Sequence, residues 1–229
     1  MVVLITGASR GLGLSLAKVF AEDGHTVYAG ARDPQSGLLQ ALAEIKDRVG
    51  IIKLDVTKEA EIQAAAERIA GETGSLDVLI NNVGIISGIG VQITELAAPE
   101  IRACLDSNLI GAMLCVKHAL PLLFKSLSPV IINISSEAGS LTAHPGIPYS
   151  YTISKAAMNA FTRILHETHG SEGLRAVSVH PGRMMTDMGK PHFTLHPDET
   201  AKGILRIARG EVQVGPYQFV DYLGNEMPI

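Results

Sequence analysis

The sequence predicts an α/β fold, a doubly wound and mostly parallel sheet of about seven strands in a single domain spanning residues 1–229. Short apolar segments alternate with helix-like segments along the whole chain. The apolar segments are hydrophobic throughout, which is typical of a parallel sheet covered on both faces. No repeat, low-complexity tract or linker divides the chain, and 229 residues with 46 % hydrophobic content can bury the core of one such domain.

Each element follows from a local pattern. The β-branched segment 2–6 predicts a strand, and the spacing of Leu12, Leu16, Val19 and Phe20 predicts a helix over 12–23 that ends near Gly24. The same reasoning gives an Ala-rich helix over 58–72. The further predicted strands are 26–31, 51–54, 78–80, 130–134, 175–179 and an edge strand at 217–222, and the further predicted helices are 36–49, 100–124, 150–167 and 197–208.

Charge and cysteine content exclude several classes of protein. The net charge of −4 is spread along the chain without a basic stripe, so we expect no nucleic-acid partner. Cys104 and Cys115 lack metal or disulfide spacing, and we expect both to be core thiols on one helix in a reducing compartment. The N-terminus has no basic leader and no long apolar stretch, so we expect a cytoplasmic protein without a membrane segment.

A glycine-rich turn follows the first predicted strand directly. It runs from Thr6 to Gly13 with glycines at 7, 11 and 13, and a helix follows. Glycine allows the unusual backbone angles and the close approach of a pyrophosphate, and the free N–H groups at a helix start attract an anion. A strand, turn and helix in this order predict a dinucleotide-binding turn, including Ser9, Arg10 and Leu12.

Further motifs in order along the chain resemble the short-chain dehydrogenase/reductase family, whose fingerprint is TGxxxGxG. The resemblance implies a Rossmann-type fold, a nicotinamide cofactor and hydride transfer at a carbonyl or alcohol. It implies a catalytic tetrad of Asn108, Ser136, Tyr151 and Lys155, the lysine also holding the nicotinamide ribose and Asn108 anchoring a water. The implied cofactor-binding residues outside the glycine-rich turn are Arg32, Asp55, Val56, Asn82, Val83, Gly84, Tyr151, Lys155, Pro181, Gly182, Met184 and Thr186.

Within this family the chain is most similar to C-factor-like and sniffer-like carbonyl reductases. The segments 149–159 and 180–189 and the short C-terminal tail carry this likeness. Two residues depart from the pattern: Val83 replaces the usual alanine, and Arg183 stands where that group tends to carry an aromatic residue. Arg183 falls on the substrate rim, so the resemblance does not identify the substrate.

The end of the second strand favours NADP over NAD. An acid there binds the ribose 2′-hydroxyl of NAD, whereas a cation accepts the 2′-phosphate of NADP. Ala31 occupies the place of the acid, Arg32 follows it, and Arg10 offers a second guanidinium. A guanidinium can bind a phosphate through two hydrogen bonds.

Tyr151 and Lys155 are four residues apart in a predicted helix and so share a face. A free tyrosine releases its proton near pH 10, and we expect the ammonium group and the oxidised nicotinamide to lower that pKa. Tyr149 lacks such a partner, because Ile153 stands four residues later. Ser136 follows an apolar strand at the carboxyl end of the sheet, where ligands bind in this architecture.

Two alternatives stay open: a catalytically idle NADP-binding redox sensor and, among enzymes, a 3-oxoacyl-carrier-protein reductase. We expect no metal site, since the pairs His166/His169 and His192/His196 have no neighbouring acid or cysteine set. Relatives commonly pair through the helices at 100–124 and 150–168, so a homodimer or homotetramer is an open prediction. The expected substrate rim comprises Ile85, Ile86, Glu137, His144, Pro148, Arg183 and residues 185–196.

Overall fold

The computed structural model describes residues 1–229 except 36–41, 43–46, 143–147 and 187–192. Its described strands form one seven-stranded sheet in the order β3-β2-β1-β4-β5-β6-β7, and every neighbouring pair is parallel. The predicted doubly wound sheet is therefore confirmed. The strands are β1 (Val2–Thr6), β2 (Thr26–Ala31), β3 (Val49–Lys53), β4 (Val78–Asn81), β5 (Val130–Ile134), β6 (Arg175–His180) and β7 (Phe219–Asp221).

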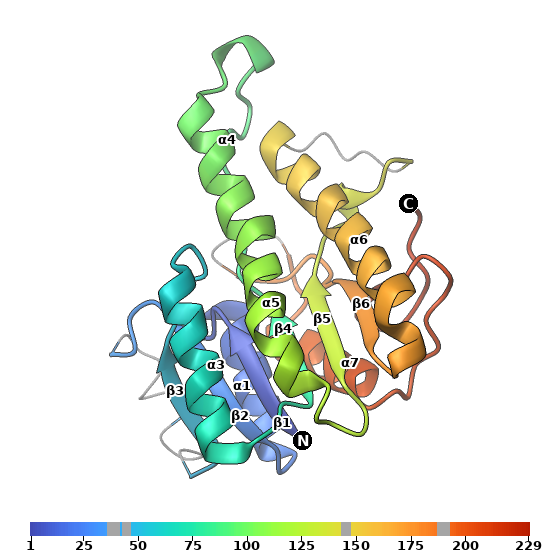
Figure 1. Ribbon diagram of the computed structural model, residues 1–229. Coiled ribbons are helices and arrows are strands. Elements are labelled where there is room, and N and C mark those ends of the chain that lie inside the picture. The colour runs from blue at the N-terminus through green and yellow to red at the C-terminus, as the bar shows by residue number, and fades with distance from the viewer. Residues whose placement is uncertain (36–41, 43–46, 143–147, 187–192) are drawn as a thin grey trace.

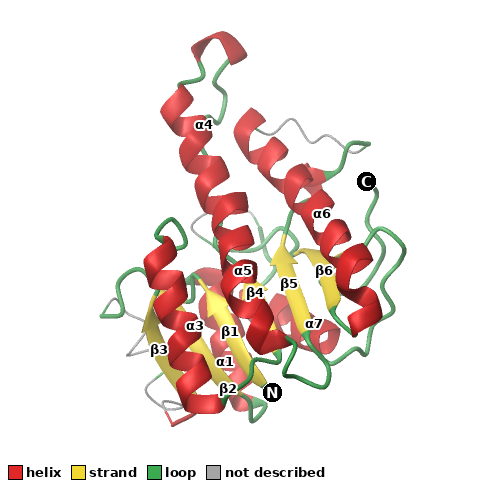
Figure 2. Cartoon of the chain, in the orientation of Figure 1, coloured by secondary structure: helices red, strands yellow, loops and turns green. Residues whose placement is uncertain are grey.

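Helices cover both faces of this sheet (Figures 1 and 2). Helices α1 and α7 pack on one face, and α3, α5 and α6 pack on the other. Helix α4 continues the line of α5 and projects away from the sheet. The bounds are α1 (Gly11–Glu22), α3 (Glu59–Thr73), α4 (Ala98–Leu105), α5 (Gly111–Leu123), α6 (Tyr149–His169) and α7 (Pro197–Ala208).

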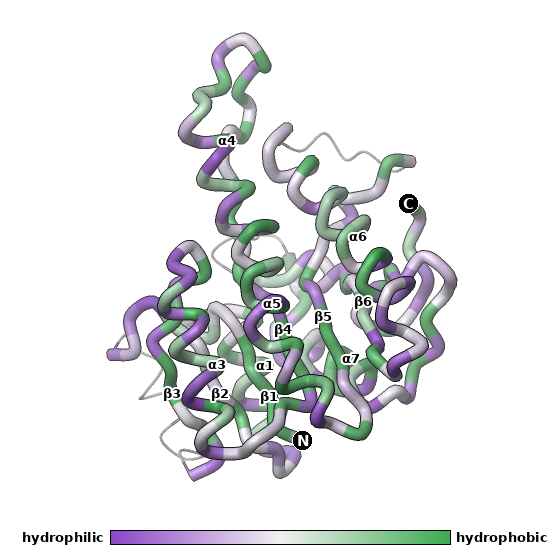
Figure 3. Tube along the Cα trace, viewed as in Figure 1, coloured by the Kyte–Doolittle hydropathy of each residue, from purple (hydrophilic) through white to green (hydrophobic). Residues whose placement is uncertain are grey.

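Two layers of core explain why the strands are hydrophobic throughout. In β1, Val3 and Ile5 belong to the cluster under α1 and α7, whereas Leu4 belongs to the cluster on the opposite face. Because side chains alternate across a strand, both sets are buried only when both faces are covered. Figure 3 shows hydrophobic residues running along the strands, while α3 and α4 mix hydrophobic and hydrophilic ones.

The predicted helical stretch over 100–124 is present, but it contains a π turn that the sequence did not predict. Helix α4 ends at Leu105, a π-helical turn spans Asp106–Ile110, and α5 begins at Gly111. Cys104 and Cys115 are both buried, but the π turn places them on different helices. Burial raises the pKa of the Cys115 thiol to about 12.

The other differences concern element ends. Strand β3 begins at Val49, so the predicted helix 36–49 loses its last residue to the sheet; most of that helix lies outside the described residues. Helix α6 is longer than predicted and includes Tyr149 and His169. None of the helices in the described part of the chain has the length and apolar character needed to cross a bilayer.

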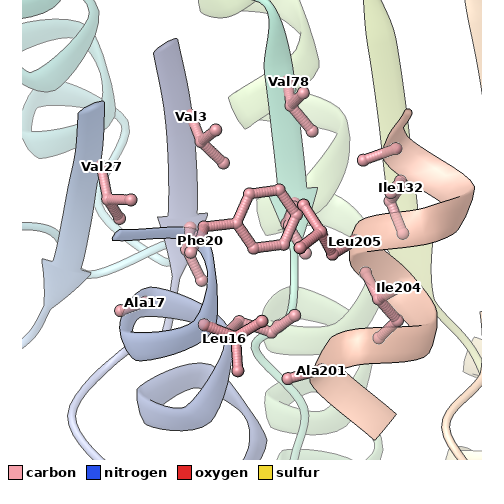
Figure 4. Packing of buried hydrophobic residues seen from close by; sticks show 14 of the residues in the cluster. Val3, Leu16, Ala17, Phe20, Val27, Val78, Ile132, Ala201, Ile204 and Leu205 are labelled. Atoms are coloured by element: carbon pink, nitrogen blue, oxygen red, sulfur yellow. The ribbon is translucent and has the colours of Figure 1, made fainter. Parts of the chain in front are cut away.

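Phe20 is the largest side chain of the core between α1 and α7. It is fully buried and lies among Val3, Val78 and Leu205 (Figure 4). We predict that Phe20→Ala lowers the free energy of unfolding by about 3–5 kcal/mol, because the truncated ring leaves a cavity. Chemical denaturation measures this. The exposed neighbour Lys18 supplies the control, since Lys18→Ala should change stability by less than about 0.5 kcal/mol; equal effects of the two substitutions would contradict the packing described.

Candidate active site

The glycine-rich turn forms an anion cradle at the start of α1. Gly7 and Gly11 have φ values of +68° and +54°, which favour glycine. A Cβ on Gly13 would lie 2.2 Å from the Gly7 carbonyl oxygen, so α1 approaches the turn as closely as only glycine permits. Arg10, the N-cap residue of α1, makes no side-chain cap, and the first turn of α1 has no acidic residue. These features fit a bound phosphate.

Asn82 fixes this turn to the end of β4. Its backbone N–H donates to Thr6 Oγ1 at 3.0 Å, and its side-chain Nδ2 donates to the carbonyls of Thr6 at 3.0 Å and Gly7 at 3.2 Å. The Val83 N–H adds a bond of 3.3 Å to Thr6 Oγ1. The two predicted motifs therefore form one hydrogen-bonded unit.

A cavity of about 290 Å³ extends from this turn along the carboxyl ends of the strands. Its walls include every predicted cofactor-binding residue except Gly182. A Cβ on Gly182 would instead lie 2.5 Å from Leu195 Cδ2, so this glycine allows close packing of the wall. Residues that were not predicted to bind the cofactor also line the cavity: Leu54, Thr57, Ile85, Ser107, Ile134 and Ser135. Most adjoin predicted residues in sequence, which is the signal that could have found them.

Arg32 and Asp55 lie at the end of the cavity formed by β2 and β3. The Asp55 carboxylate accepts hydrogen bonds from Thr57 N at 3.0 Å and Thr57 Oγ1 at 2.7 Å. Burial acts to raise the pKa of Asp55, but the Thr57 bonds and the nearby charges of Lys58 and Arg32 lower it below its usual value. Ala31 ends β2 and is 1 % exposed, so no acidic side chain occupies its position.

Tyr151 and Lys155 line the opposite end of the same cavity. Tyr151 is 7 % exposed and Lys155 is 3 % exposed. Lys155 Nζ donates to the Ile134 carbonyl at 2.6 Å and lies 5.7 Å from the centre of the Tyr151 ring. Helix α6 thus brings the two side chains together, as their spacing predicts.

The pKa of Tyr151 shifts opposite to expectation. Burial raises it above its usual value, and a hydrogen bond with Ser136 only partly opposes this. Burial also lowers the pKa of Lys155 to about 8. The net shift is upward, because desolvation of the Tyr151 hydroxyl outweighs its hydrogen bond with Ser136.

Asn108 and Ser136 do not line the cavity. Asn108 is fully buried in the π turn, where its Oδ1 accepts from Ile85 N at 2.8 Å and its Nδ2 donates to Ser154 Oγ at 3.0 Å. Ser136 is 8 % exposed, and its Oγ accepts from Ala138 N at 3.2 Å. The Ser136 hydroxyl is connected to the cavity by its hydrogen bond with Tyr151, which lines the cavity. The Asn108 side chain instead holds the backbone of Ile85 in place.

An ion pair joins two residues of the predicted substrate rim. Arg183 binds Glu137 through two hydrogen bonds of 2.8 and 3.2 Å. Ile86 packs against the small cluster of Cys104, Ala138 and Tyr151. Of the remaining predicted rim, His144 and residues 187–192 lie outside the described residues.

One histidine of each pair considered as metal ligands makes another contact in the structure. His169 pairs with Glu172 at 2.7 Å, and His196 caps α7 by accepting from Asp198 N at 3.2 Å. His192 lies outside the described residues. Within the described ranges, no three His, Cys, Asp or Glu side chains gather as metal ligands.

The buried lysine should reduce stability at neutral pH. The folded-state pKa of about 8 lies below the ordinary 10.5, so folding penalises the charged form below pH 8, and the penalty falls as pH rises toward 10.5. We predict that Lys155→Met stabilises the cofactor-free protein at pH 7 by about 2 kcal/mol, since relief of desolvation (~3 kcal/mol) exceeds one lost hydrogen bond (~1 kcal/mol). Urea denaturation between pH 7 and 10 measures this. The exposed Lys58→Met is the control, and a stability difference that does not shrink with rising pH would contradict the assignment.

Comparisons with known proteins agree with this geometry. Residues 1–195 match the family model for short chain dehydrogenases. A 3-ketodihydrosphingosine reductase of Bacteroides thetaiotaomicron is 33 % identical over 192 residues; the match covers 83 % of this chain and 62 % of that protein, less than two thirds of its length.

Two solved structures cover nearly the whole chain. The NADPH-bound carbonyl reductase from chicken fatty liver has a TM-score of 0.89 and 31 % identity, covering 99 % of this chain and 98 % of the other. The carbonyl reductase Sniffer of D. melanogaster has a TM-score of 0.88 and 29 % identity, with the same coverage. The resemblance seen in the sequence is confirmed, and the chain belongs to the short chain dehydrogenase family.

Proposed function

We propose that this protein is an NADPH-dependent oxidoreductase that reduces a ketone or aldehyde to an alcohol. One observation carries the proposal: Tyr151 and Lys155 stand on the wall of the same cavity as the open N-terminus of α1 and its glycine cradle. A proton donor therefore lies where a dinucleotide bound at the cradle would end. The printed activities of the two structural neighbours, both carbonyl reductases, support this choice.

The residues present fit a nicotinamide dinucleotide. Gly7, Gly11 and Gly13 leave room for the pyrophosphate, and the N–H groups of α1 face it. Asp55 and Val56 would hold the adenine end, and Lys155 the nicotinamide ribose. When bound, the nicotinamide supplies the hydride.

The protein's own part is to place the carbonyl oxygen and give it a proton. The raised pKa of Tyr151 keeps its hydroxyl protonated at neutral pH, as a general acid requires. Ser136, which hydrogen-bonds Tyr151, is positioned to share the same substrate oxygen. The buried Lys155 has a pKa of about 8, close enough to neutral pH to return a proton to the tyrosine after each turnover.

Arg32 and Arg10 both line the cavity, and Ala31 leaves the space of an acidic residue, which favours NADP over NAD. The NADPH bound to the chicken carbonyl reductase supports the same choice.

The redox-sensor alternative would need no proton donor, and the buried pair of Tyr151 and Lys155 argues against it. A 3-oxoacyl-carrier-protein reductase uses the same catalytic groups, so only substrate comparison distinguishes it: acetoacetyl-coenzyme A should then outperform simple ketones. Assembly through the helices at 100–124 and 150–168 stays a prediction; Ile110, Met113, Ile153 and Ile164 are exposed there.

The tyrosine can be tested directly. We predict that Tyr151→Phe lowers kcat by about 10²–10⁴-fold while NADPH still binds, because only the proton donor is removed. NADPH oxidation with a panel of ketones and aldehydes, together with fluorescence titration of NADPH, measures both quantities. Tyr149→Phe is the matched control, since Tyr149 lies on the same helix, two residues before Tyr151, and is 45 % exposed. Near-normal turnover by Tyr151→Phe would exclude the tyrosine mechanism.

Cofactor choice gives a second test. A charge-assisted hydrogen bond to the 2′-phosphate contributes about 1.5–3 kcal/mol, or roughly 10- to 150-fold in affinity. We therefore expect Ala31→Asp with Arg32→Ala to erase or reverse the preference for NADPH and leave kcat nearly unchanged. The ratio of kcat/KM for NADPH and NADH measures the effect, with Arg206→Ala on α7 as the control. A ratio that does not move would show that Arg32 does not contact the phosphate.

A further inference from the structure

The turn that carries Ser136 is tied to the end of β6 by a histidine. His180 is the last residue of β6, and its Nδ1 accepts a hydrogen bond of 3.1 Å from the backbone N–H of Glu137. That N–H belongs to the peptide unit directly after Ser136. Since Nδ1 is the acceptor, the imidazole is neutral and carries its proton on Nε2.

Further contacts hold the same turn on both sides. The Glu137 carboxylate binds Arg183, three residues beyond His180. On the opposite side Asn159 of α6 donates to the Gly139 carbonyl at 3.3 Å. The sheet itself does not depend on the histidine, because Ser135 N–H continues the ladder to the Val179 carbonyl at 2.8 Å. Loss of the His180 bond would therefore loosen the turn while leaving the strand in place.

We propose that His180 is a positioning residue for the Ser136 hydroxyl, acting through the Glu137 N–H and only while its imidazole is neutral. The proposal rests on the proposed function, since it assigns Ser136 to the substrate oxygen. Protonation puts a hydrogen on Nδ1, which then faces the Glu137 N–H as a second donor. Activity should consequently fall in acid for a reason separate from the ionisation of Tyr151 or Lys155.

The charges around His180 set the pH at which this happens. Burial lowers the pKa of His180 below its ordinary 6.5. Glu137 on the Ser136 turn and Asp221 on β7, which is its register partner, both raise that pKa, whereas Arg183 in the loop after β6 lowers it. Removing Glu137 or Arg183 should therefore move the pKa in opposite directions.

Two substitutions separate the hydrogen bond from the titration. In His180→Asn a carboxamide oxygen can accept the Glu137 N–H but does not titrate; in His180→Leu no acceptor is present. We expect wild-type kcat/KM to fall as the pH drops below the His180 pKa and to level off near the value of His180→Leu, because loss of a positioning contact lowers the rate by a limited factor. His180→Asn should keep the neutral-pH rate and lose this acid limb, and His180→Leu should lose roughly 5- to 150-fold at every pH, the equivalent of one buried hydrogen bond.

Nuclear magnetic resonance of the cofactor-free protein gives a readout independent of turnover. The His180 imidazole resonance, assigned by its absence in His180→Asn, should titrate at the pH of the kinetic limb. Glu137→Gln should lower this pKa and Arg183→Gln should raise it, and the kinetic limb should follow each shift. Circular dichroism at each pH confirms that the protein stays folded.

The outcomes are distinguishable. An acid limb that survives in His180→Asn, or one that ignores both charge substitutions, would overturn the positioning role while NADPH-dependent turnover stands. Absence of turnover by the wild type with every carbonyl compound tested would overturn the proposed function, and the inference with it.

Discussion

The position of helix α6 depends on a chain of buried side-chain hydrogen bonds across the sheet. Asn81 of β4 donates to Asn133 of β5 at 2.8 Å, Asn133 donates to Thr162 of α6 at 2.9 Å, and Ser178 of β6 donates to the same threonine at 2.7 Å. These side chains are at most 3 % exposed, so an unmade bond would leave a desolvated polar group. Thr162 lies two helical turns after Lys155 and on the same face of α6. These hydrogen bonds therefore fix the rotation of α6 that directs Lys155 into the cavity.

Desolvation is the main electrostatic influence on Tyr151 and Lys155. It opposes the charged forms of both Tyr151 and Lys155. In water their pKa values differ by less than one unit, and burial separates them by raising the pKa of Tyr151 and lowering that of Lys155. The tyrosine is kept as an acid and the lysine becomes easier to deprotonate. The proton-transfer pair proposed above would therefore arise from burial of one helix face, without a carboxylate partner for the lysine among the contacts described.

Most of the framework could be predicted because its signals are local. The glycines at 7, 11 and 13 predict a phosphate-binding turn from a few neighbouring residues, and a tyrosine four residues before a lysine predicts that both lie on one helix face. The direction of the Tyr151 shift could not be predicted, because burial depends on how Ile86, Cys104 and Ala138 pack around the ring. The contact between His180 and Glu137 joins segments 43 residues apart, and no pattern in either segment predicts that the two meet.

The π turn at Asp106–Ile110 has a consequence for how relatives of this chain are aligned. A π turn holds one residue more than an α turn, and each residue in a helix adds a rotation of about 100°. A relative that is one residue shorter here would not have lost a dispensable surface position. Its helix would rewind, Asn108 would leave its pairing with Ile85, and Cys104 would rotate away from the Tyr151 ring. A one-residue gap in this segment therefore indicates that the packing behind Ile85 and Tyr151 has changed, even in a relative that conserves every proposed catalytic residue.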